Sequence, residues 1–519
     1  MQLIIPMSGM GTRFLEKGYA LPKPLITISG KPMIQHVVEM FPGVEETLFI
    51  VNKVHFDDPS LNLETTLNEM YPGCKIVVIE SHKFGPVWAI QMAKEFVNLN
   101  VPVVVNYCDF ACLWDFKSFR KELESGIDGL IATYSGFHPH MLSSTQYAYL
   151  KLDANRNLAD IREKTSFTNN PSNEPASSGT YGFKTGKILL EAIAEQIQQK
   201  HSYNDEYYSS LTYVNMIKRD MKIKNFEIEK FFQWGTPSDF EEFKRQKNFF
   251  QFRKTSKPFD LPIDRIELLA AGAGQRFKAA GYEVIKPLLP LENSFLAEAA
   301  LNAFNAHSAE KGILLQRETY VPEEFLDSIK SNGVAVTRVT GLTRGQADSA
   351  SIAMGRINQG NCVIAPCDSL LFPKNDQQLS EIRGKTLGVW VTSPSLYALE
   401  NPQQFGWVSV NSDNEVTESW IKTEPITGKD RKVITGSFIF GDSHEGALLL
   451  EKFLDSNLTV SGEFYLDSVL SFATKYGWEV VALEPEWFIS LGTPDEYETY
   501  IYWEKLFAIR KDLLVPDED

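Results

Sequence analysis

Short apolar runs alternate with helical stretches along the whole chain. Runs rich in β-forming residues occupy residues 76–79, 103–105, 334–336 and 362–364. Helical stretches lie between them, such as Val87 to Phe96 and Ser349 to Ile357. Alternation of this kind is typical of parallel strands whose faces are covered by helices. The pattern therefore predicts an α/β fold built on a mostly parallel mixed sheet flanked by helices.

One glycine-rich pattern occurs twice, each time after an apolar run that reads as a strand. The first copy reads Gly9-Met10-Gly11-Thr12-Arg13-Phe14, then Gly18-Tyr19, then Lys23-Pro24-Leu25. The second reads Gly272-Ala273-Gly274-Gln275-Arg276-Phe277, then Gly281-Tyr282, then Lys286-Pro287-Leu288. The separation of matching landmarks drifts from 263 residues at Gly9 and Gly272 to 257 at Gly235 and Gly492. We expect a duplicated domain with small loop deletions, over residues 1–250 and 263–519, with 251–262 as the linker.

Each half closes with a Gly-Thr-Pro segment, at Gly235 and at Gly492. A threonine N-cap, a proline at the first helical position and an acidic residue two positions later form a strong helix start. We therefore expect a helix from Pro237 and another from Pro494. The acidic tail from Pro516 to Asp519 is expected to be a solvated chain end.

Charge and composition narrow the class of partner. The formal net charge of -16 argues against nucleic acid or an anionic membrane surface as the main partner, because both favour a basic face. A small anion stays open, since a few placed cations can dominate one site. Five cysteines in mostly apolar runs are typical of reduced thiols in a cytosolic protein, and we expect no disulfide framework. With no signal sequence or membrane span in the pattern, a soluble cytoplasmic protein is expected.

The glycine loops are candidate phosphate-binding sites. Small residues after a first strand let backbone N–H groups approach phosphate oxygens, and the following helix start adds a favourable dipole. The spacing fits neither the Walker A loop nor the dinucleotide fingerprint, whose third glycine is replaced by Phe14 and Phe277. Arg13 and Lys23 could bracket a polyphosphate, as Arg276 and Lys286 could in the second copy. The alternative reading is an ordinary turn between surface cations.

With these motifs the chain resembles the sugar-1-phosphate nucleotidyltransferases, the sugar-nucleotide pyrophosphorylase family. The resemblance rests on S-G-M-G-T-R-F, P-K-P-L and G-K-P-M in the first half and on A-G-A-G-Q-R-F and I-K-P-L in the second. It extends through Cys108-Asp109, Cys367-Asp368, Glu163-Lys164 and both Gly-Thr-Pro segments. It implies two tandem Rossmann-like nucleotidyltransferase domains and covers nearly the whole chain.

The resemblance also implies roles for individual residues. The loop Ser8, Gly9, Met10, Gly11 and Thr12 would hold the triphosphate, with Gly272, Ala273, Gly274 and Gln275 as its second copy. Arg13 and Lys23 would neutralise the departing pyrophosphate and the α-phosphate. Asp109, repeated as Asp368, matches the aspartate that binds Mg²⁺. Glu163 and Lys164 would contact the sugar and its phosphate, and the loop at Gly85, repeated at Gly345 and Gln346, would read the base.

The chain departs from the family pattern at four places. Pro86 stands where the second half has Gln346, which leaves base recognition in the first half open. Ile421 stands at the position of Glu163, so that only Lys422 of the pair remains in the second half. Asn293-Ser294-Phe295 replaces Gly30-Lys31-Pro32. Many members carry a second metal-binding aspartate where this chain has Gln233 and Ser490, so a two-carboxylate metal site is doubtful in both halves.

The expected reaction joins a nucleoside triphosphate to a phosphorylated sugar with release of pyrophosphate, giving an activated sugar nucleotide for surface polysaccharide synthesis. Three alternatives stay open: a cytidylyltransferase for a phosphorylated small alcohol, a chain with one catalytic and one regulatory half, and a glycosyltransferase. The last lacks its Asp-x-Asp motif here. His138 and His140 are expected to be a loop pair, and the cysteines free thiols. Homo-oligomerisation stays open.

Overall fold

The computed structural model describes residues 1–142, 147–256, 260–291, 294–316, 321–355, 359–375, 377–423 and 430–516. The ends of the predicted stretch Ser349 to Ile357 and of the acidic tail, the middle of the predicted linker, and Asn293 fall outside these residues. The chain divides into two compact units. The first contains Met1–Lys254 and Tyr502–Asp519, and the second contains Thr255–Ile501. The predicted ranges differ from these units in that they assign the last residues to the second copy.

The first unit is built on a mixed sheet that has nine strands among the described residues. Four strands pair in parallel in the order β6-β1-β4-β5, and β8 pairs in parallel with β12. The strand β11 joins these two groups, because it pairs antiparallel with both β6 and β8. It also pairs antiparallel with β9 of the β9/β10 hairpin. The strands are β1 (Gln2–Met7), β4 (Glu46–Asn52), β5 (Lys75–Ile79), β6 (Val103–Asn106), β8 (Gly129–Tyr134), β9 (Ala148–Leu152), β10 (Leu158–Glu163), β11 (Ala176–Phe183) and β12 (Ile223–Glu227).

The second unit repeats this sheet pair by pair, again with nine strands among the residues described. Parallel pairs join β18-β17-β14-β19 and β21 with β25, while β24 pairs antiparallel with β19, β21 and the β22/β23 hairpin. The strands are β14 (Arg265–Ala270), β17 (Glu310–Gln316), β18 (Val334–Val339), β19 (Cys362–Pro366), β21 (Thr386–Thr392), β22 (Gly406–Val410), β23 (Val416–Ile421), β24 (Arg431–Phe440) and β25 (Glu479–Leu483). The duplicated α/β fold is thereby confirmed.

Four small pairs of strands complete the two units. β7 (Phe110–Leu113) pairs with β13 (Lys230–Gln233), and β20 (Ser369–Pro373) repeats this pairing with β26 (Pro485–Ser490). β2 (Thr27–Ile28) pairs with β3 (Lys31–Pro32), as β15 (Pro290–Leu291) does with β16 (Ser294–Phe295). These pairs follow the same order in both units, so that the duplication extends to the loops around the sheets.

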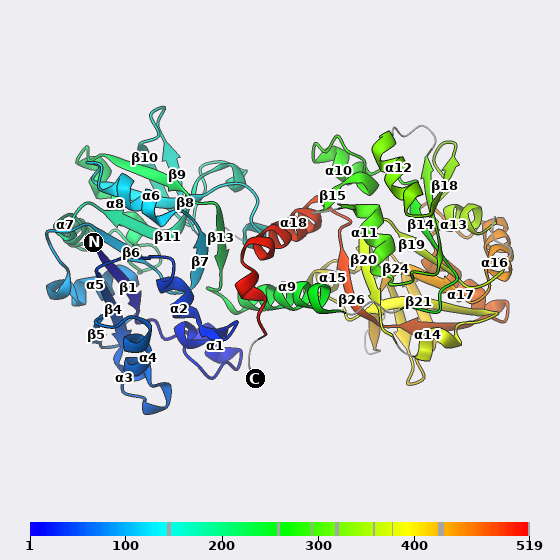
Figure 1. Ribbon diagram of the computed structural model, residues 1–519, viewed down its shortest axis with the longest axis horizontal. Coiled ribbons are helices and arrows are strands. Elements are labelled where there is room, and N and C mark those ends of the chain that lie inside the picture. Colours follow the sequence, from blue (N-terminus) through cyan, green and yellow to red (C-terminus); the bar gives the residue numbers. More distant parts are fainter. Residues whose placement is uncertain are drawn as a thin grey trace. The chain divides into compact units, whose positions relative to one another are not determined.

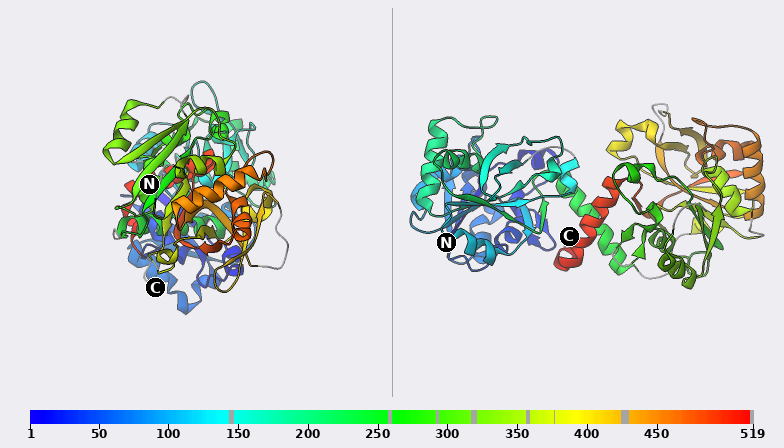
Figure 2. Two further views of the ribbon diagram at one scale, coloured as in Figure 1. Left: turned by 90° about the vertical axis from the view of Figure 1, so that its right-hand side faces the viewer. Right: turned by 90° about the horizontal axis from the view of Figure 1, so that it is seen from above.

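Helices lie on both sides of each sheet (Figures 1 and 2). In the first unit they are α1 (Thr12–Glu16), α2 (Met33–Val38), α3 (Lys53–Phe56), α4 (Leu63–Met70), α5 (Pro86–Met92), α6 (Phe116–Leu123), α7 (Gly186–Gln198), α8 (Ser209–Lys218) and α9 (Pro237–Thr255). The later helices are α10 (Gln275–Ala279), α11 (Leu296–Ala303), α12 (Glu323–Ser331), α13 (Gln346–Met354), α14 (Gln377–Glu381), α15 (Leu396–Glu400), α16 (Ser443–Asp455), α17 (Asp467–Lys475) and α18 (Pro494–Ile509). None of the described helices is both long and apolar enough to cross a membrane.

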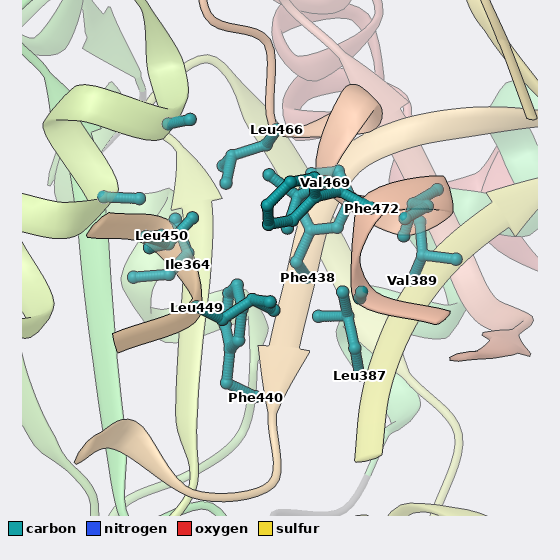
Figure 3. Packing of buried hydrophobic residues seen from close by; sticks show 14 of the residues in the cluster. Ile364, Leu387, Val389, Phe438, Phe440, Leu449, Leu450, Leu466, Val469 and Phe472 are labelled. Carbon is teal, nitrogen blue, oxygen red and sulfur yellow. The ribbon is translucent and has the colours of Figure 1, made fainter. Parts of the chain in front are cut away.

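Each sheet buries an apolar face against helices. In the second unit, Phe438 of β24 packs among Leu387 of β21, Leu450 of α16 and Val469 of α17 (Figure 3). The first unit has a matching cluster that joins the sheet to α5, α7 and α8. Burying apolar side chains contributes about 25 cal/mol per Å² removed from water, so these faces hold each unit together. They leave the carboxyl ends of the parallel strands free to carry loops.

The predicted helix starts are confirmed. Asp239 donates its backbone N–H to Thr236 Oγ1 at 3.2 Å, and Glu496 donates its own to Thr493 Oγ1 at 3.3 Å. These bonds satisfy N–H groups that have no partner within a helix. The predicted helix Val87 to Phe96 is interrupted: α5 ends at Met92 and a 3₁₀ turn covers Lys94–Phe96. The five cysteines are free thiols, and all except Cys74 are buried.

The last residues of the chain complete the core of the first unit. Leu513 is fully buried, and its carbonyl accepts a 2.7 Å hydrogen bond from Ser29 Oγ. The ring of Phe507 lies 5.4 Å from that of Phe250 in α9, and the Arg510 guanidinium lies over the ring of Phe232. The first unit is therefore made from the two ends of the sequence.

Candidate functional site

The glycine loop of the first unit follows β1 directly. Gly11 has φ of 66°, a left-handed conformation that a side chain adopts only at a cost. Phe14 is buried and anchors the loop, whereas Thr12 and Arg13 are exposed at the surface. The helix that follows, α1, has only five residues, so its dipole adds less than the sequence pattern predicts. Binding of an anion at this loop would therefore depend mainly on backbone N–H groups and nearby cations.

Lys23 and Asp109 meet beside this loop. Lys23 Nζ lies 2.7 Å from Asp109 Oδ2, and their side chains are 18% and 26% exposed. A Cβ built on Gly11 would lie 3.7 Å from the backbone nitrogen of Lys23, which places the lysine against the loop. Burial is the largest single influence and would lower the pKa of Lys23, but the charge of Asp109, the neighbouring Cys108 and the hydrogen bond to Asp109 together raise the pKa above its ordinary value. The lysine therefore stays charged.

The closing Gly-Thr-Pro segment of the first unit lies against Asp109. Asp109 lies between β6 and β7, and its carbonyl accepts a 2.8 Å hydrogen bond from the Trp234 N–H. A Cβ built on Gly235 would lie 3.1 Å from Asp109 Oδ2, so glycine lets the chain pass close to the carboxylate. Burial raises the pKa of Asp239, at the start of α9, while its hydrogen bonds and the charge of Arg13 oppose this rise. Residues from three distant parts of the sequence thus gather around one loop.

A second group of polar residues lies where β10 meets α8. The Glu163 carboxylate accepts a hydrogen bond from Ser210 and is buried. Lys164 has φ of 54°, and its Nζ donates to Tyr208 Oη at 2.9 Å. Burial raises the pKa of Glu163 to about 7, against the opposing effects of the Ser210 hydrogen bond and the Lys164 charge. The arrangement offers a cation and a carboxylate to one ligand.

The Gly85 loop is tied to this second group. Gly85 has φ of 83°, and a Cβ built on it would lie 2.9 Å from the carbonyl oxygen of Tyr207. Tyr207 donates its N–H to the Phe84 carbonyl at 2.8 Å, and Val87 donates to the Tyr207 carbonyl at 3.1 Å. The loop therefore lies directly against the segment that carries Tyr208. Burial raises the pKa of Tyr107, and the charges of Glu163 and Asp109 raise it further, so this tyrosine lies near both groups.

The second unit repeats the first group closely. Lys286 Nζ lies 2.6 Å from Asp368 Oδ2, and the Leu491 N–H donates to the Asp368 carbonyl at 2.8 Å. Gly274 has φ of 63° and Gly345 has φ of 139°. Gln275, Arg276, Gln346 and Lys422 are exposed, and Lys422 has φ of 52°. The structure thus brings Lys286 to Asp368 and reproduces the conformation of Gly11 at Gly274, whereas Gly345 shares only the positive φ of Gly85.

Several polar residues of these groups carry no sequence motif. Tyr107, Glu206, Tyr208 and Ser210 have no place in the motif set that identified the other residues. The internal repeat contains a signal for two of them, because Glu206 and Tyr208 return as Glu463 and Tyr465 at the same 257-residue separation as Gly235 and Gly492. Comparison of the two halves position by position would have found this pair.

Asp109 and Asp368 are the donors that a metal ion would use. Within the part of the chain that the structure describes, no three His, Cys, Asp or Glu side chains gather into a group that could hold a metal ion. The Asp109 and Asp368 side chains are 26% and 24% exposed, each with one oxygen against a lysine. A single accessible carboxylate fits Mg²⁺, which takes its remaining ligands from phosphate and water. The two histidines that the sequence pairs lie elsewhere: His138 is buried and His140 partly exposed, and both pack around Tyr134.

The fold and these groups define an α/β protein built from two copies of one domain, each with a lysine–aspartate pair beside a glycine loop. Residues 3–247, which lie within the first unit, match the model of the nucleotidyl transferase family.

Curated relatives match over short segments. One is a UTP–glucose-1-phosphate uridylyltransferase of Haemophilus ducreyi, 39% identical over 77 residues, which are 13% of this chain and 26% of that protein. Another is a UTP–glucose-1-phosphate uridylyltransferase of Streptococcus pyogenes, 36% identical over 124 residues, which are 20% of this chain and 40% of that protein. The chain thus spans well under half the length of these relatives.

Among solved structures, the nucleoside-diphosphate-sugar pyrophosphorylase from Vibrio cholerae RC9 is similar with a TM-score of 0.39 and 21% identity. The match covers 47% of this chain and 99% of that one.

Proposed function

We propose that the chain is a nucleotidyltransferase that joins a nucleoside triphosphate to a phosphorylated sugar and releases pyrophosphate. One observation carries the proposal: a lysine, an aspartate and a left-handed glycine loop meet in the same geometry in both units. The match of residues 3–247 to the nucleotidyl transferase family supports it, as do the uridylyltransferase relatives.

In the proposed reaction an oxygen of the acceptor phosphate forms a bond to the α-phosphorus of the triphosphate. The bond from that phosphorus to the bridging oxygen breaks, and pyrophosphate leaves with the electron pair. A phosphate monoester is already ionised near neutral pH, so the reaction needs no general base. The task of the protein is to position two anions and to neutralise their charge.

Each residue group has a role in this proposal. The loop Ser8 to Thr12 holds the triphosphate, while Arg13 and Lys23 neutralise the transferring and leaving phosphates. Asp109 would hold Mg²⁺, whose positive charge would further offset the phosphates when it is bound. Lys164 contacts the acceptor phosphate and Glu163 its hydroxyl groups, and the Gly85 loop lies where the base would bind. The residues of the second unit take the corresponding roles, with Asp368 as the metal ligand.

A screen for pyrophosphate release tests the proposal. The full chain is incubated with Mg²⁺, each of the four common triphosphates and a panel of phosphorylated sugars and small alcohols. We expect release with at least one pair, and the pair identifies the substrate class. Release from CTP with a phosphorylated alcohol would instead select the cytidylyltransferase alternative.

Variants then assign the reaction to a unit. Lys23→Ala and Asp109→Ala are expected to slow release by the first unit about 100-fold or more, because each removes a group that acts on the transferring charge, so that the chain keeps only the release that the second unit supplies. Lys17→Ala is a matched control, since Lys17 is an exposed lysine of the same loop region. Lys286→Ala tests the second unit in the same way. Unchanged release by both Lys23→Ala and Lys286→Ala would overturn the proposed site.

We further propose, from the family resemblance, that the product supplies surface polysaccharide synthesis. From the cysteines and the apolar pattern of the sequence, we propose that it is made in the cytoplasm.

A further inference from the structure

In each unit a strand hairpin packs against a helix, and the proposed function places the acceptor there; we call this region the acceptor end. The acceptor ends of the two units differ at three matching positions. In the first unit Glu163 of β10 lies opposite Ala148 of β9. In the second, Ile421 of β23 lies opposite Gly406 of β22 in the same register. The third position is on the helix that packs against each hairpin: Ser210 of α8 corresponds to Asp467 of α17. The first unit therefore has Ala, Glu and Ser where the second has Gly, Ile and Asp.

Both units have a carboxylate at the acceptor end, but it comes from the strand in the first unit and from the helix in the second. In the first unit it comes from the strand and receives a hydrogen bond from the helix residue, Ser210. In the second unit the helix residue, Asp467, carries it instead. A Cβ added to Gly406 would collide with Asp467 Oδ2 and would lie 2.9 Å from Asp467 Cγ. Gly406 is not among the glycines with positive φ, so its backbone does not require glycine. The missing side chain makes room for the carboxylate.

The surroundings of this carboxylate are conserved between the units. Lys422 repeats the left-handed conformation of Lys164, and its N–H donates to the Phe405 carbonyl at 3.1 Å as that of Lys164 does to Tyr147 at 2.9 Å. In the second unit Lys422 Nζ donates to Tyr465 Oη, and Tyr465 donates to Glu463. In the first unit Lys164 donates to Tyr208 and Tyr208 to Glu206 in the same way. Non-glycine residues in this conformation cost about 1–3 kcal/mol each and persist mostly at functional sites.

Stability of the fold does not explain Asp467. No side chain caps the N-terminus of α17, so the aspartate does not act as a helix cap. Burial raises the pKa of Asp467 to about 6, which shows that the site penalises the charged form, as it does for Glu163. A carboxylate that is kept against this cost, with a glycine opposite to admit it, is a functional feature.

We propose that the second unit holds an acceptor site for a phosphorylated polyol, in which Asp467 replaces Glu163 as the acceptor of ligand hydroxyl groups and Lys422 binds the phosphate. The proposal rests on the proposed function, since the roles of Glu163 and Lys164 come from it. It goes further because Ile421 by itself indicates a lost site, whereas the three changes together indicate a rebuilt one. Because the carboxylate comes from a strand in one unit and from a helix in the other, it approaches the ligand from a different direction. The two sites therefore need not prefer the same polyol.

Calorimetric titration of the full chain tests this site. Lys164→Ala removes the phosphate-binding lysine of the first unit and leaves the second unit intact. The probes are glucose 1-phosphate, inositol 1-phosphate and glycerol 3-phosphate. Inorganic phosphate, which has no polyol part, is the comparison probe. We expect the Lys164→Ala protein to bind at least one of the three with about one equivalent per chain. Binding of none of them would overturn the proposal.

A second set of variants identifies Asp467 as the residue responsible. In the Lys164→Ala background, Asp467→Ser is expected to weaken polyol phosphate binding about tenfold or more without weakening inorganic phosphate. Asp467→Asn, which keeps the shape of the side chain, is expected to do the same and guards against a folding effect. Asp455→Ser, an exposed aspartate of the same unit, is the matched control. Unchanged affinity in Asp467→Ser and Asp467→Asn would contradict the proposal.

Rescue gives the sharpest result. Adding Gly406→Ala and Ile421→Glu to Asp467→Ser recreates the arrangement of the first unit and is expected to restore binding to within a few fold. A purely structural role for Asp467 would not predict this rescue.

The outcomes also separate this inference from the proposed function. Binding that depends on Asp467, in a chain that releases no pyrophosphate with any pair, would leave the site standing and overturn the reaction. Pyrophosphate release without any effect of Asp467 would do the reverse.

Discussion

Lys164 and Lys422 show how single residues mark the acceptor end of each unit. Both adopt a left-handed backbone conformation and both donate to a tyrosine. Asparagine or glycine would adopt this conformation at lower cost, so the lysine is kept for its side chain. Each ammonium group reaches a tyrosine that lies just before the following helix, Tyr208 before α8 and Tyr465 before α17. A sequence contains no direct sign of such a conformation.

Glu163 gives a prediction about pH. Burial raises its pKa to about 7, so it is protonated at pH 6 and ionised at pH 8. The ionised form is the better acceptor of hydroxyl hydrogen bonds. We expect the KM for the acceptor to fall as the pH rises from 6 to 8, by about threefold to tenfold more than in Glu163→Gln. The variant serves as the control because the phosphate of the acceptor titrates equally in both proteins.

The same shift fixes the sign of a stability effect. The folded pKa lies above the ordinary value of 4.5, so Glu163 contributes stability below about pH 4.5, and this contribution is lost as the pH rises to about 7. The melting temperature of the wild type should therefore fall relative to that of Glu163→Gln across this interval. A constant difference between the two proteins would contradict the assignment.

Gly85 gives a steric prediction. Gly85→Ala places a Cβ 2.9 Å from the Tyr207 carbonyl oxygen, in addition to the backbone strain at φ of 83°. The control is Gly73→Ala, because Gly73 has φ of 82° with nothing within 4 Å of an added Cβ. Strain alone costs about 1–3 kcal/mol. Thermal unfolding should show a larger loss for Gly85→Ala than for Gly73→Ala, and equal losses would show that the Tyr207 contact gives way easily.

Secondary-structure elements follow from the sequence where the signal is local. The caps at Thr236 and Thr493 and the strands before both glycine loops are set by neighbouring residues, and the structure confirms them. The break after Met92 was not predicted, because the apolar pattern continues to Phe96. Asp467 was also missed, since a motif comparison examines the strand position, Ile421, and not the helix that packs on it. Contacts between distant elements leave no local pattern.

The final turn of the chain gives a prediction for one element. Leu513 is fully buried in the first unit, whereas Val515, two residues later, is half exposed. Leu513→Ala should lower the free energy of unfolding of the first unit by about 2–5 kcal/mol, because it leaves a cavity. Val515→Ala should change it by less than about 0.5 kcal/mol. Chemical denaturation followed by tryptophan fluorescence measures both, and similar losses would contradict the placement of Leu513.

At the scale of the whole molecule, the same strand pairings and the same lysine–aspartate contact occur in both units. We therefore expect two nucleotide sites per chain. Equilibrium dialysis with the triphosphate chosen by the pyrophosphate screen should give about two equivalents for the wild type. Lys23→Ala and Lys286→Ala should each remove one, because a charged hydrogen bond to phosphate contributes about 1.5–3 kcal/mol. A single equivalent in the wild type would show that one glycine loop does not bind the nucleotide.

The use of both chain ends in the first unit has a consequence for biosynthesis. Ser29 leaves the ribosome early, but its partner Leu513 is 484 residues further on. At about 5–20 residues per second, the N-terminal half waits about 10–50 seconds after residue 254 before its missing piece is translated. Domains made first usually fold first, yet here the later one can finish before the earlier one. Nascent chains stalled before residue 502 should carry a first unit that proteases still cut readily, and its resistance should appear only at release.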